Sequence, residues 1–451
     1  MCRRHITRAA EIVIAGNLAV FSLAGCANYT QYSPLPLPEK IDLAERLPVQ
    51  ATQPLDMNAV ATVAVLLNPD LKAARLKSGV AEAQAFAAGI LPNPVLTANL
   101  DPAIGGGSEV TGYGLGIEYD IQALIVQPAR VAIANAARDE ARLSLLWQEW
   151  QTVAQARTLY VQRANATEKT AIYSALQERY ATQAERSGRA LQTGDVTFDT
   201  AGIDLAALLD VRSQLSTTER TAAQTDYALR TLLGVAPQVE VPLQSLMQPL
   251  IPDRAAVETA LAKVAQSRPD LRALQFGYQS QQETLRRSVL AQFPSLSLGV
   301  GAANDTTNVH TISLGATLNL PLFDRNQGDI AVQSATRAQL LAEYQARLNQ
   351  TTGDAWRIWT EMQQLSAAIA DIEARLPELQ VAADNAERAY LAGDLPALTY
   401  VTLQSSVLNR QTEISDLRQS LWNDAIALSS VIGTQVEPTV EPALETKGPM
   451  P

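Results

Sequence analysis

The sequence predicts a mainly helical fold in which one unit, made of a helix, two strands and a long helical hairpin, occurs twice. Three observations support this. Similar segments recur in the same order, about 200 residues apart. Each copy holds two short stretches in which apolar and polar residues alternate, the period of a strand with two different faces. Each copy then continues in long stretches with few Gly or Pro residues, as long helices require.

The repeat rests on landmarks that keep their order over most of the chain, a pattern to be sought before any fold is assigned. "NPDLKAARLKSGVAEAQ" from Asn68 matches "RPDLRALQFGYQSQQ" from Arg268, and "GILPNPVLTANL" matches "AQFPSLSLGVGA". The remaining matches are the turns "TGD" and "AGD" at Gly194 and Gly393, and the segment ends at Gly234 and Gly433.

The first element of each unit is a helix of about twenty residues. It begins at Pro69-Asp70 or Pro269-Asp270, because Pro and Asp both suit the first turn of a helix. It ends before Pro92 or Pro294.

Two strands follow in each unit. From Tyr113 to Ile121, large apolar residues alternate with Gly, Glu and Asp, and the less regular strand before it spans 95–100. In the second unit the strands lie at 296–300 and in "HTISLGATLNL", His310 to Leu320. We expect strands of about nine to eleven residues, which is long enough to cross a bilayer when tilted.

A very long helical hairpin completes each unit. No Gly or Pro occurs from Ala129 to Ser187, and Pro128 is predicted in the first turn. The recurring charged residues exclude a membrane span. The chain reverses at Gly194-Asp195 and Gly393-Asp394, where both aspartates are expected to be helix N-caps. Pro377 predicts a kink or break in the second outgoing helix.

Composition excludes several classes of function. The net charge of −11 argues against nucleic-acid binding. The chain has two Cys, at positions 2 and 26, and two His, at positions 5 and 310, so a His/Cys metal site or a Cys–His or Ser–His nucleophile lacks its residues. We therefore predict no enzyme activity, no cofactor and no metal site.

The N-terminus has the pattern of an export signal, with a basic start and an apolar stretch too short to span a membrane. "LAGC", Leu23 to Cys26, resembles the bacterial lipobox, which makes Cys26 the acylated first residue of the mature protein; Ala27 after it resembles the outer-membrane sorting pattern. The alternative is an ordinary secretory signal with an incidental Cys. The predicted divisions are a signal peptide (1–25), a lipid-anchored extension (26–55), a first repeat (56–235), a linker (236–252), a second repeat (253–434) and a disordered tail (435–451).

Four strands cannot close a membrane sheet, because the smallest known barrels have about eight strands. Several chains must therefore contribute to one barrel, with apolar faces toward lipid and polar faces toward the lumen. The alternative is a soluble helical protein whose short hairpins pack on helices.

The tandem repeat, the strand pairs, the "GD" turns and "LPLFDRNQG" (Leu320 to Gly328) together resemble the outer-membrane factors, the TolC-like channels of tripartite efflux pumps, over positions 56–434. The resemblance implies a homotrimeric α/β-barrel channel in outer-membrane lipid, with its helices in the periplasm. It also implies a periplasmic adaptor (membrane fusion) protein and an inner-membrane pump of the resistance–nodulation–division type. Asp324-Arg325-Asn326-Gln327 resembles the heavy-metal branch, while drugs are the alternative cargo.

In this family the periplasmic aperture lies near the two turns, Gly194-Asp195 and Gly393-Asp394. Some members place two aspartates six and nine residues after the second glycine. Here those positions hold Thr399 and Thr402, so an aspartate ring is not supported. In the first unit, Asp199 and Asp204 either line the mouth or are solvated helix residues.

The rival function is that of a lipidated periplasmic coiled-coil adaptor or scaffold protein. Such adaptors are also exported and carry long helical hairpins. They carry one hairpin flanked by β-rich modules, whereas this chain has one unit written twice. The repeat therefore favours the channel.

Overall fold

The computed structural model describes residues 43–47, 54–102, 104 and 110–433. The predictions for the signal peptide, Cys26 and the tail at 435–451 lie outside the described residues. From Ala44 onward the chain forms one compact unit, so both repeats belong to the same body.

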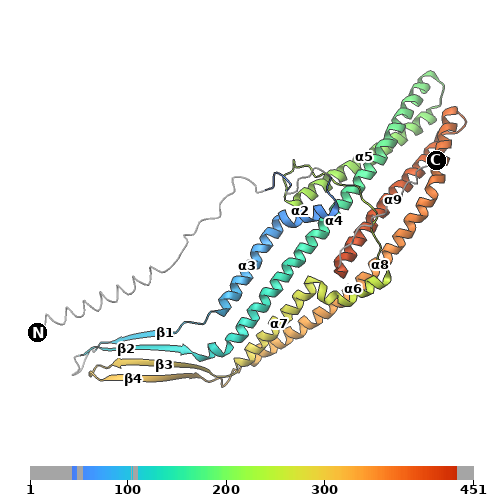
Figure 1. Cartoon of the computed structure of the whole chain (residues 1–451). Helices are drawn as coiled ribbons and strands as arrows, with labels where there is room; N and C mark the ends of the chain where they lie inside the picture. The colour runs from blue at the N-terminus through green and yellow to red at the C-terminus, as the bar shows by residue number, and fades with distance from the viewer. Residues whose placement is uncertain (1–42, 48–53, 103, 105–109, 434–451) are drawn as a thin grey trace, which may run out of the picture. The chain divides into compact units, whose positions relative to one another are not determined.

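The order of elements repeats as the sequence predicts: a helix, two strands and a hairpin, twice (Figure 1). Two short helices, α2 and α6, precede the units and were not predicted. The first half contains α2 (Met57–Leu67), α3 (Pro69–Gly89), β1 (Val95–Asp101), β2 (Gly112–Asp120), α4 (Ile121–Thr193) and α5 (Phe198–Leu233). The second half contains α6 (Arg254–Ser267), α7 (Pro269–Leu290), β3 (Ser295–Asn304), β4 (His310–Asn319), α8 (Gln327–Ala392) and α9 (Ala397–Ile432).

Two predictions about prolines were wrong. Pro128 is not in the first turn of α4, because the helix begins at Ile121, where the Asp120 carboxylate accepts hydrogen bonds from the next backbone N–H groups. This cap starts the helix about two turns early, and Pro128 lies inside it. Likewise, α8 continues through Pro377 to Ala392 without a break.

The strands form one antiparallel sheet in the order β1-β2-β3-β4, so β1 and β4 are its free edges. β1 has seven residues, fewer than expected, while β3 and β4 have ten each. The sheet lies at one end of α4 and α8, and the two hairpin turns lie at the other end (Figure 1). At 1.5 Å per residue, the 73 residues of α4 extend about 110 Å.

Shorter helices flank the two long ones. On the sheet side, α3 packs on α4, and α7 lies between α4 and α8. On the hairpin side, α5 packs on α4 and α9 packs on both α4 and α8. The junction of α5 with α3 is close, because a Cβ on Gly234 (φ +65°) would lie 2.6 Å from the Leu67 carbonyl oxygen. Only glycine fits this position without strain.

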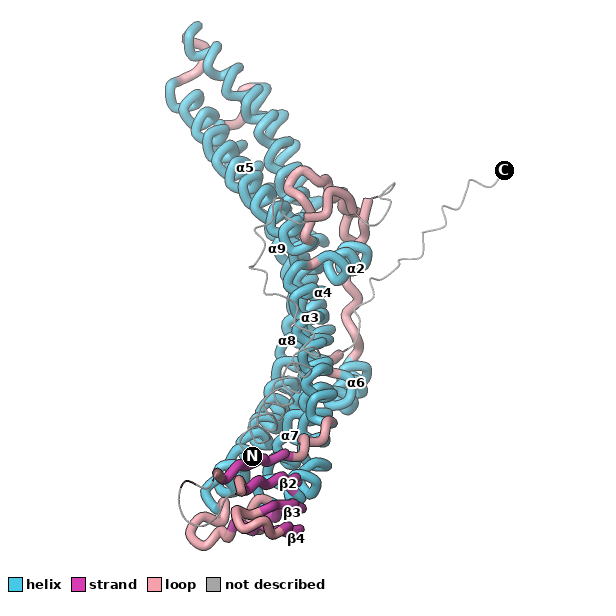
Figure 2. The backbone as a smooth tube through the Cα atoms, turned by 90° about the vertical axis from the view of Figure 1, so that its left-hand side faces the viewer, coloured by secondary structure: helices cyan, strands magenta, loops and turns pink. Residues whose placement is uncertain are grey.

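The linker between the repeats is held by aromatic donors from both. It lies with α2 and α6 on the same side of the long helices (Figure 2). Tyr160 donates to the Gln244 carbonyl (2.7 Å), and Trp359 and Trp422 donate to linker carbonyls at 2.8 Å each. These bonds hold the linker against α4, α8 and α9.

Among the described residues, no helix combines the length and the apolar character that crossing a membrane requires.

Candidate functional site: the polar sheet face and the hairpin tips

The sheet has two chemically different faces. Residues directly opposite each other in antiparallel strands point to the same side, and the observed register groups small and polar residues with one another. That face carries, in strand order, Thr97, Asn99 and Asp101; Gly112, Gly114, Gly116, Glu118 and Asp120; Ser295, Ser297, Gly299 and Gly301; and Thr311, Ser313, Gly315, Thr317 and Asn319. The opposite face carries Leu96, Leu100, Tyr113, Leu115, Ile117, Tyr119, Leu296, Leu298, Val300, Ile312, Leu314 and Leu318.

The polar face is small and acidic. Its charged side chains are Asp101, Glu118 and Asp120, and none of the four strands contains Lys or Arg. A passage lined by this face would attract cations electrostatically. The apolar face is solvent-exposed in the single chain, with Leu314 at 87% and Ile312 at 83%.

The two hairpin turns share one geometry. Gly194 and Gly393 both have φ +83°, a left-handed conformation that ends α4 and α8. The next residues, Asp195 and Asp394, donate their backbone N–H groups back to the carbonyls of Ala190 (2.8 Å) and Ala389 (2.9 Å).

The predicted N-caps at these turns were wrong. α5 is capped by Thr197, and Pro396 occupies the N-cap position of α9. Asp195 and Asp394 belong instead to the closing turns of the outgoing helices. The Asp195 carboxylate accepts from Thr193 Oγ1 at 2.5 Å.

The structure separates the four aperture candidates. Asp199, Thr399 and Thr402 are exposed close to the turns. Asp204 is only 2% exposed, so in the chain it neither faces a lumen nor is solvated, and both readings of it were wrong.

Asp204 instead joins the two hairpins. Its Oδ2 accepts from the Tyr390 hydroxyl (2.8 Å) and from Gln183 Nε2 (3.2 Å), which links α5 to α8 and α4. Burial, together with the Asp204 charge, raises the pKa of Tyr390 to about 12, so this hydroxyl is a donor at neutral pH. Tyr390 also stacks on Tyr400, with ring centroids 5.0 Å apart. Sequence reasoning missed this link, although Tyr390 lies three residues before the turn glycine.

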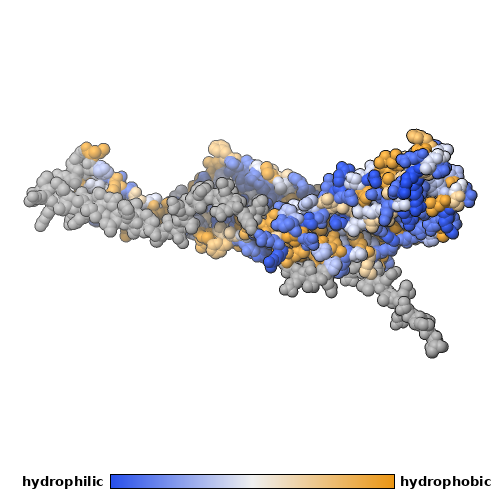
Figure 3. Space-filling view, turned by 90° about the horizontal axis from the view of Figure 1, so that it is seen from above, coloured by the Kyte–Doolittle hydropathy of each residue, from blue (hydrophilic) through white to orange (hydrophobic). Residues whose placement is uncertain are grey.

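Large apolar side chains are exposed near the turns. Phe198 is 82% exposed, Leu398 61% and Leu391 54%. Figure 3 shows hydrophobic and hydrophilic atoms intermixed at this end of the helices. Exposed apolar groups at a helical tip are a feature of protein-binding surfaces.

With this geometry in view, the comparisons with known proteins decide the family. Residues 260–434 match the family model described as "Outer membrane efflux protein". Through its second repeat, the chain belongs to the outer membrane efflux protein family. The expectation that this chain is a channel protein and not an enzyme is thereby confirmed.

Relatives of this efflux protein agree. The "Cobalt-zinc-cadmium resistance protein CzcC" of Cupriavidus metallidurans is 25% identical over 297 residues, which are 65% of this chain and 69% of CzcC. The crystal structure of CusC, studied for "transmembrane channel formation", matches with a TM-score of 0.72 and 17% identity, covering 91% of this chain and 100% of CusC. The CmeC outer membrane channel of Campylobacter jejuni matches with a TM-score of 0.70 and 15% identity, covering 92% and 96%.

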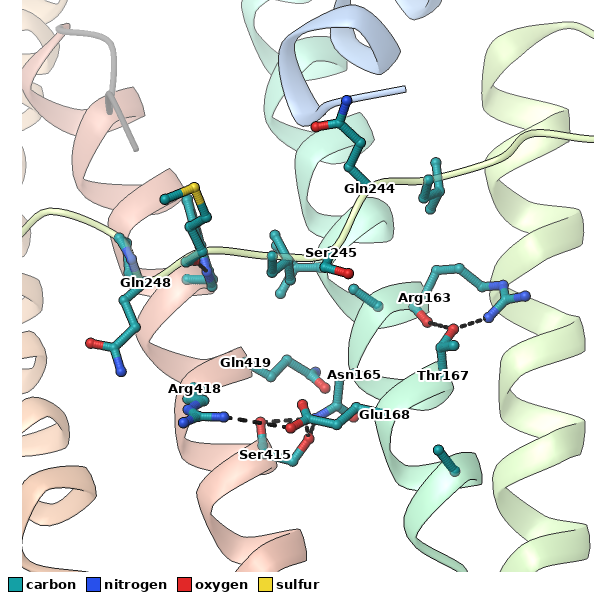
Figure 4. Close-up of a pocket in the computed structure, with 18 of the residues that line it drawn as sticks. Arg163, Asn165, Thr167, Glu168, Gln244, Ser245, Gln248, Ser415, Arg418 and Gln419 are labelled. Carbon is teal, nitrogen blue, oxygen red and sulfur yellow. Dashed lines mark hydrogen bonds and ion pairs between the residues drawn. The ribbon is translucent and has the colours of Figure 1, made fainter. Parts of the chain in front are cut away.

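A cavity of about 670 Å³ lies where the linker crosses α4 and α9 (Figure 4). Its polar wall joins the two repeats of the efflux protein. Ser415 Oγ donates to Glu168 (2.8 Å), and Asn165 Nδ2 donates to the Ser415 carbonyl (2.9 Å). Arg418 adds an ion pair to Glu373 (2.7 Å). These groups satisfy one another, which indicates a structural joint.

Over the described residues, no cluster of three or more His, Cys, Asp or Glu side chains is arranged to hold a metal ion.

Proposed function

We propose that this efflux protein is the outer-membrane exit channel of a tripartite efflux system and works as a homotrimer. The observation that carries the proposal is a sheet with one apolar face, one small polar face and two unpaired edges. A membrane sheet must close so that no edge is left unsatisfied. Three copies of the four-stranded sheet would give twelve strands, a barrel wide enough for a lumen.

The strand directions support closure between copies. Neighbouring strands alternate in direction, so β4 of one copy runs antiparallel to β1 of the next. The apolar face would then contact lipid. Tyr113 and Tyr119, near the two ends of β2, would occupy the aromatic girdles at the membrane surfaces. The acidic polar face would line the lumen.

The periplasmic partners would meet the hairpin end. An adaptor protein contacting the exposed Phe198, Leu391 and Leu398 would bury apolar surface. The turns at Gly194-Asp195 and Gly393-Asp394, with Asp199, Thr399 and Thr402, would surround the periplasmic aperture. The pump behind the adaptor would be an inner-membrane transporter of the resistance–nodulation–division type.

For the cargo we propose divalent heavy-metal cations, supported by the relative named for cobalt, zinc and cadmium resistance. The strands offer carboxylates and a single imidazole, His310, on the apolar face, which is a poor set for tight binding of soft cations. The channel would therefore be a passive, cation-preferring exit, and selection would lie in the pump. Drugs are the competing cargo.

At the N-terminus, we propose that Cys26 is acylated and begins the mature protein, anchoring it in the outer membrane. Mass spectrometry of the N-terminal peptide tests this directly. An unmodified Cys26, or cleavage elsewhere, contradicts it without touching the channel proposal.

One set of measurements tests the channel. The protein purified in mild detergent should have the mass of three chains. In planar bilayers it should conduct with a cation preference that falls as salt is raised. Deleting the gene should sensitise cells to zinc, cobalt or cadmium more than to bulky drugs. A monomer without conductance contradicts the channel, and drug sensitivity with unchanged metal tolerance contradicts the metal cargo.

A further inference from the structure

Helix α3 has an apolar face with no partner inside the chain. The helix packs mainly on α4, and Leu71 is the one buried residue among its 21. On its free side, Leu76 is 72% exposed and Val80 is 56% exposed, and Ala83 and Ala87 continue the same exposed row. Their spacing of four, three and four residues is that of a helix–helix seam.

The second repeat shows what such a face does when a neighbour is present. Helix α7 corresponds to α3, with Pro269 matching Pro69, and it lies between α4 and α8. Ala273 is only 7% exposed, whereas its counterpart Ala73 is exposed. Ser280, the counterpart of Val80, donates to the Ile133 carbonyl of α4 at 3.3 Å. The equivalent face is therefore a helix contact within the chain.

A complementary row lies on the opposite edge of the same body. α8 borders the β4 edge of the sheet, whereas α3 borders the β1 edge (Figure 1). The free side of α8 presents alanines with the same spacing of four, three and four residues. They are Ala331, Ala335, Ala338 and Ala342, and all are exposed.

The contacts between α7 and α8 set the relative level of the two rows. Gln275 bonds to Tyr344 (2.9 Å), and Ser288 bonds to Asp329. Moved to the first repeat by 200 residues, these contacts place position 75 level with 344 and position 88 level with 329. The two rows then align along their whole length, and the two helices run in opposite directions.

We infer that α3 of one copy packs against α8 of a second copy of this chain, antiparallel, with large side chains of α3 over alanines of α8. The facing pairs are Leu76 with Ala342, Val80 with Ala338, Ala83 with Ala335, and Ala87 with Ala331. This seam rests on the proposed homotrimer and specifies one of its contacts. It continues on the helices the edge-to-edge pairing of β4 with β1 of the next copy, just as α4 with α7 continues β2 with β3 inside one chain.

A cysteine cross-link tests the seam and its register. The full-length protein carries Ala83→Cys with Ala335→Cys, and is oxidised in membranes and run on a denaturing gel without reductant. A disulfide needs Cα atoms about 4.4–6.8 Å apart, which facing positions of the seam provide. The control is Ala83→Cys with Ala342→Cys, seven residues or about 10 Å further along the same row. The unsubstituted protein serves as the blank for Cys2 and Cys26.

The matched pair should form dimers and trimers that reductant dissolves, at a yield about five-fold or more above the control pair. If the protein is a trimer by mass but the two pairs cross-link equally, or neither does, the seam is wrong and the channel proposal stands. If the protein is a monomer by mass, both fall.

Discussion

The two ends of the long helices differ in how much of their packing the chain completes by itself. At the hairpin end, Tyr400 and Asp204 are 3% and 2% exposed, and side chains from four helices fill the interior. At the sheet end, all ten residues of β4 are exposed. The hairpin end is thus a finished core, whereas the sheet end needs lipid and further copies. The two ends should therefore fail in different ways when they are mutated.

The largest effect is expected on the apolar face of the sheet. Leu314→Arg places a charge toward lipid, which costs about 2–4 kcal/mol at the bilayer centre. The adjacent Ser313→Arg places the same charge on the polar face, beside Gly301. We expect the first variant to lose most of its outer-membrane insertion and the second to insert like the wild type. The fraction of protein in the outer membrane measures both.

Equal losses for the two variants would contradict the assignment of the faces. Equal tolerance would contradict the membrane location of the sheet itself. Neither variant should alter the hairpin end.

The sequence predicted elements whose signals are local. Alternation located the strands, Pro69 and Pro269 marked helix starts, and Gly194 and Gly393 marked the turns. Errors arose where a nearby group overrode a local rule. The Asp120 carboxylate starts α4 before Pro128, and α8 continues through Pro377.

The link at Asp204 could not be predicted in this way. Its partners, Gln183 and Tyr390, are 21 and 186 residues away in the sequence, on two other helices. No spacing within α5 distinguishes Asp204 from a solvated aspartate such as Asp199. Only the packing of the two hairpins against each other buries it.

A smaller effect is expected from Tyr390→Phe at the hairpin end. The change removes the 2.8 Å hydrogen bond to the Asp204 carboxylate. Hydrogen bonds to charged groups contribute about 1.5–3 kcal/mol. The hairpins should therefore separate more easily, which faster proteolysis near residues 190–204 would report. Tyr344→Phe is the matched control, because its hydroxyl bonds to Gln275 at an exposed site.

The pH dependence sharpens this test. A tyrosine pKa raised to about 12 in the folded state means that its contribution is complete at lower pH and is lost only as the pH rises toward 12. The difference between Tyr390→Phe and the wild type should thus be constant from pH 6 to 9. A difference that disappears within that range would contradict the hydroxyl-to-carboxylate bond.

The smallest effects are expected from two glycines of the hairpin end, with opposite signs. Gly194 has φ +83°, where a side chain costs about 1 kcal/mol. Gly202 lies inside α5, and a Cβ there would meet no atom within 4 Å. Because Gly in a helix interior is about 1 kcal/mol less favourable than Ala, Gly202→Ala should slow amide hydrogen exchange at the start of α5. Gly194→Ala should accelerate exchange at the end of α4. Both changes add one methyl group within one tip, so if the added bulk alone disturbed the packing, both rates would shift the same way. Opposite shifts would instead show that backbone conformation governs this end of the molecule.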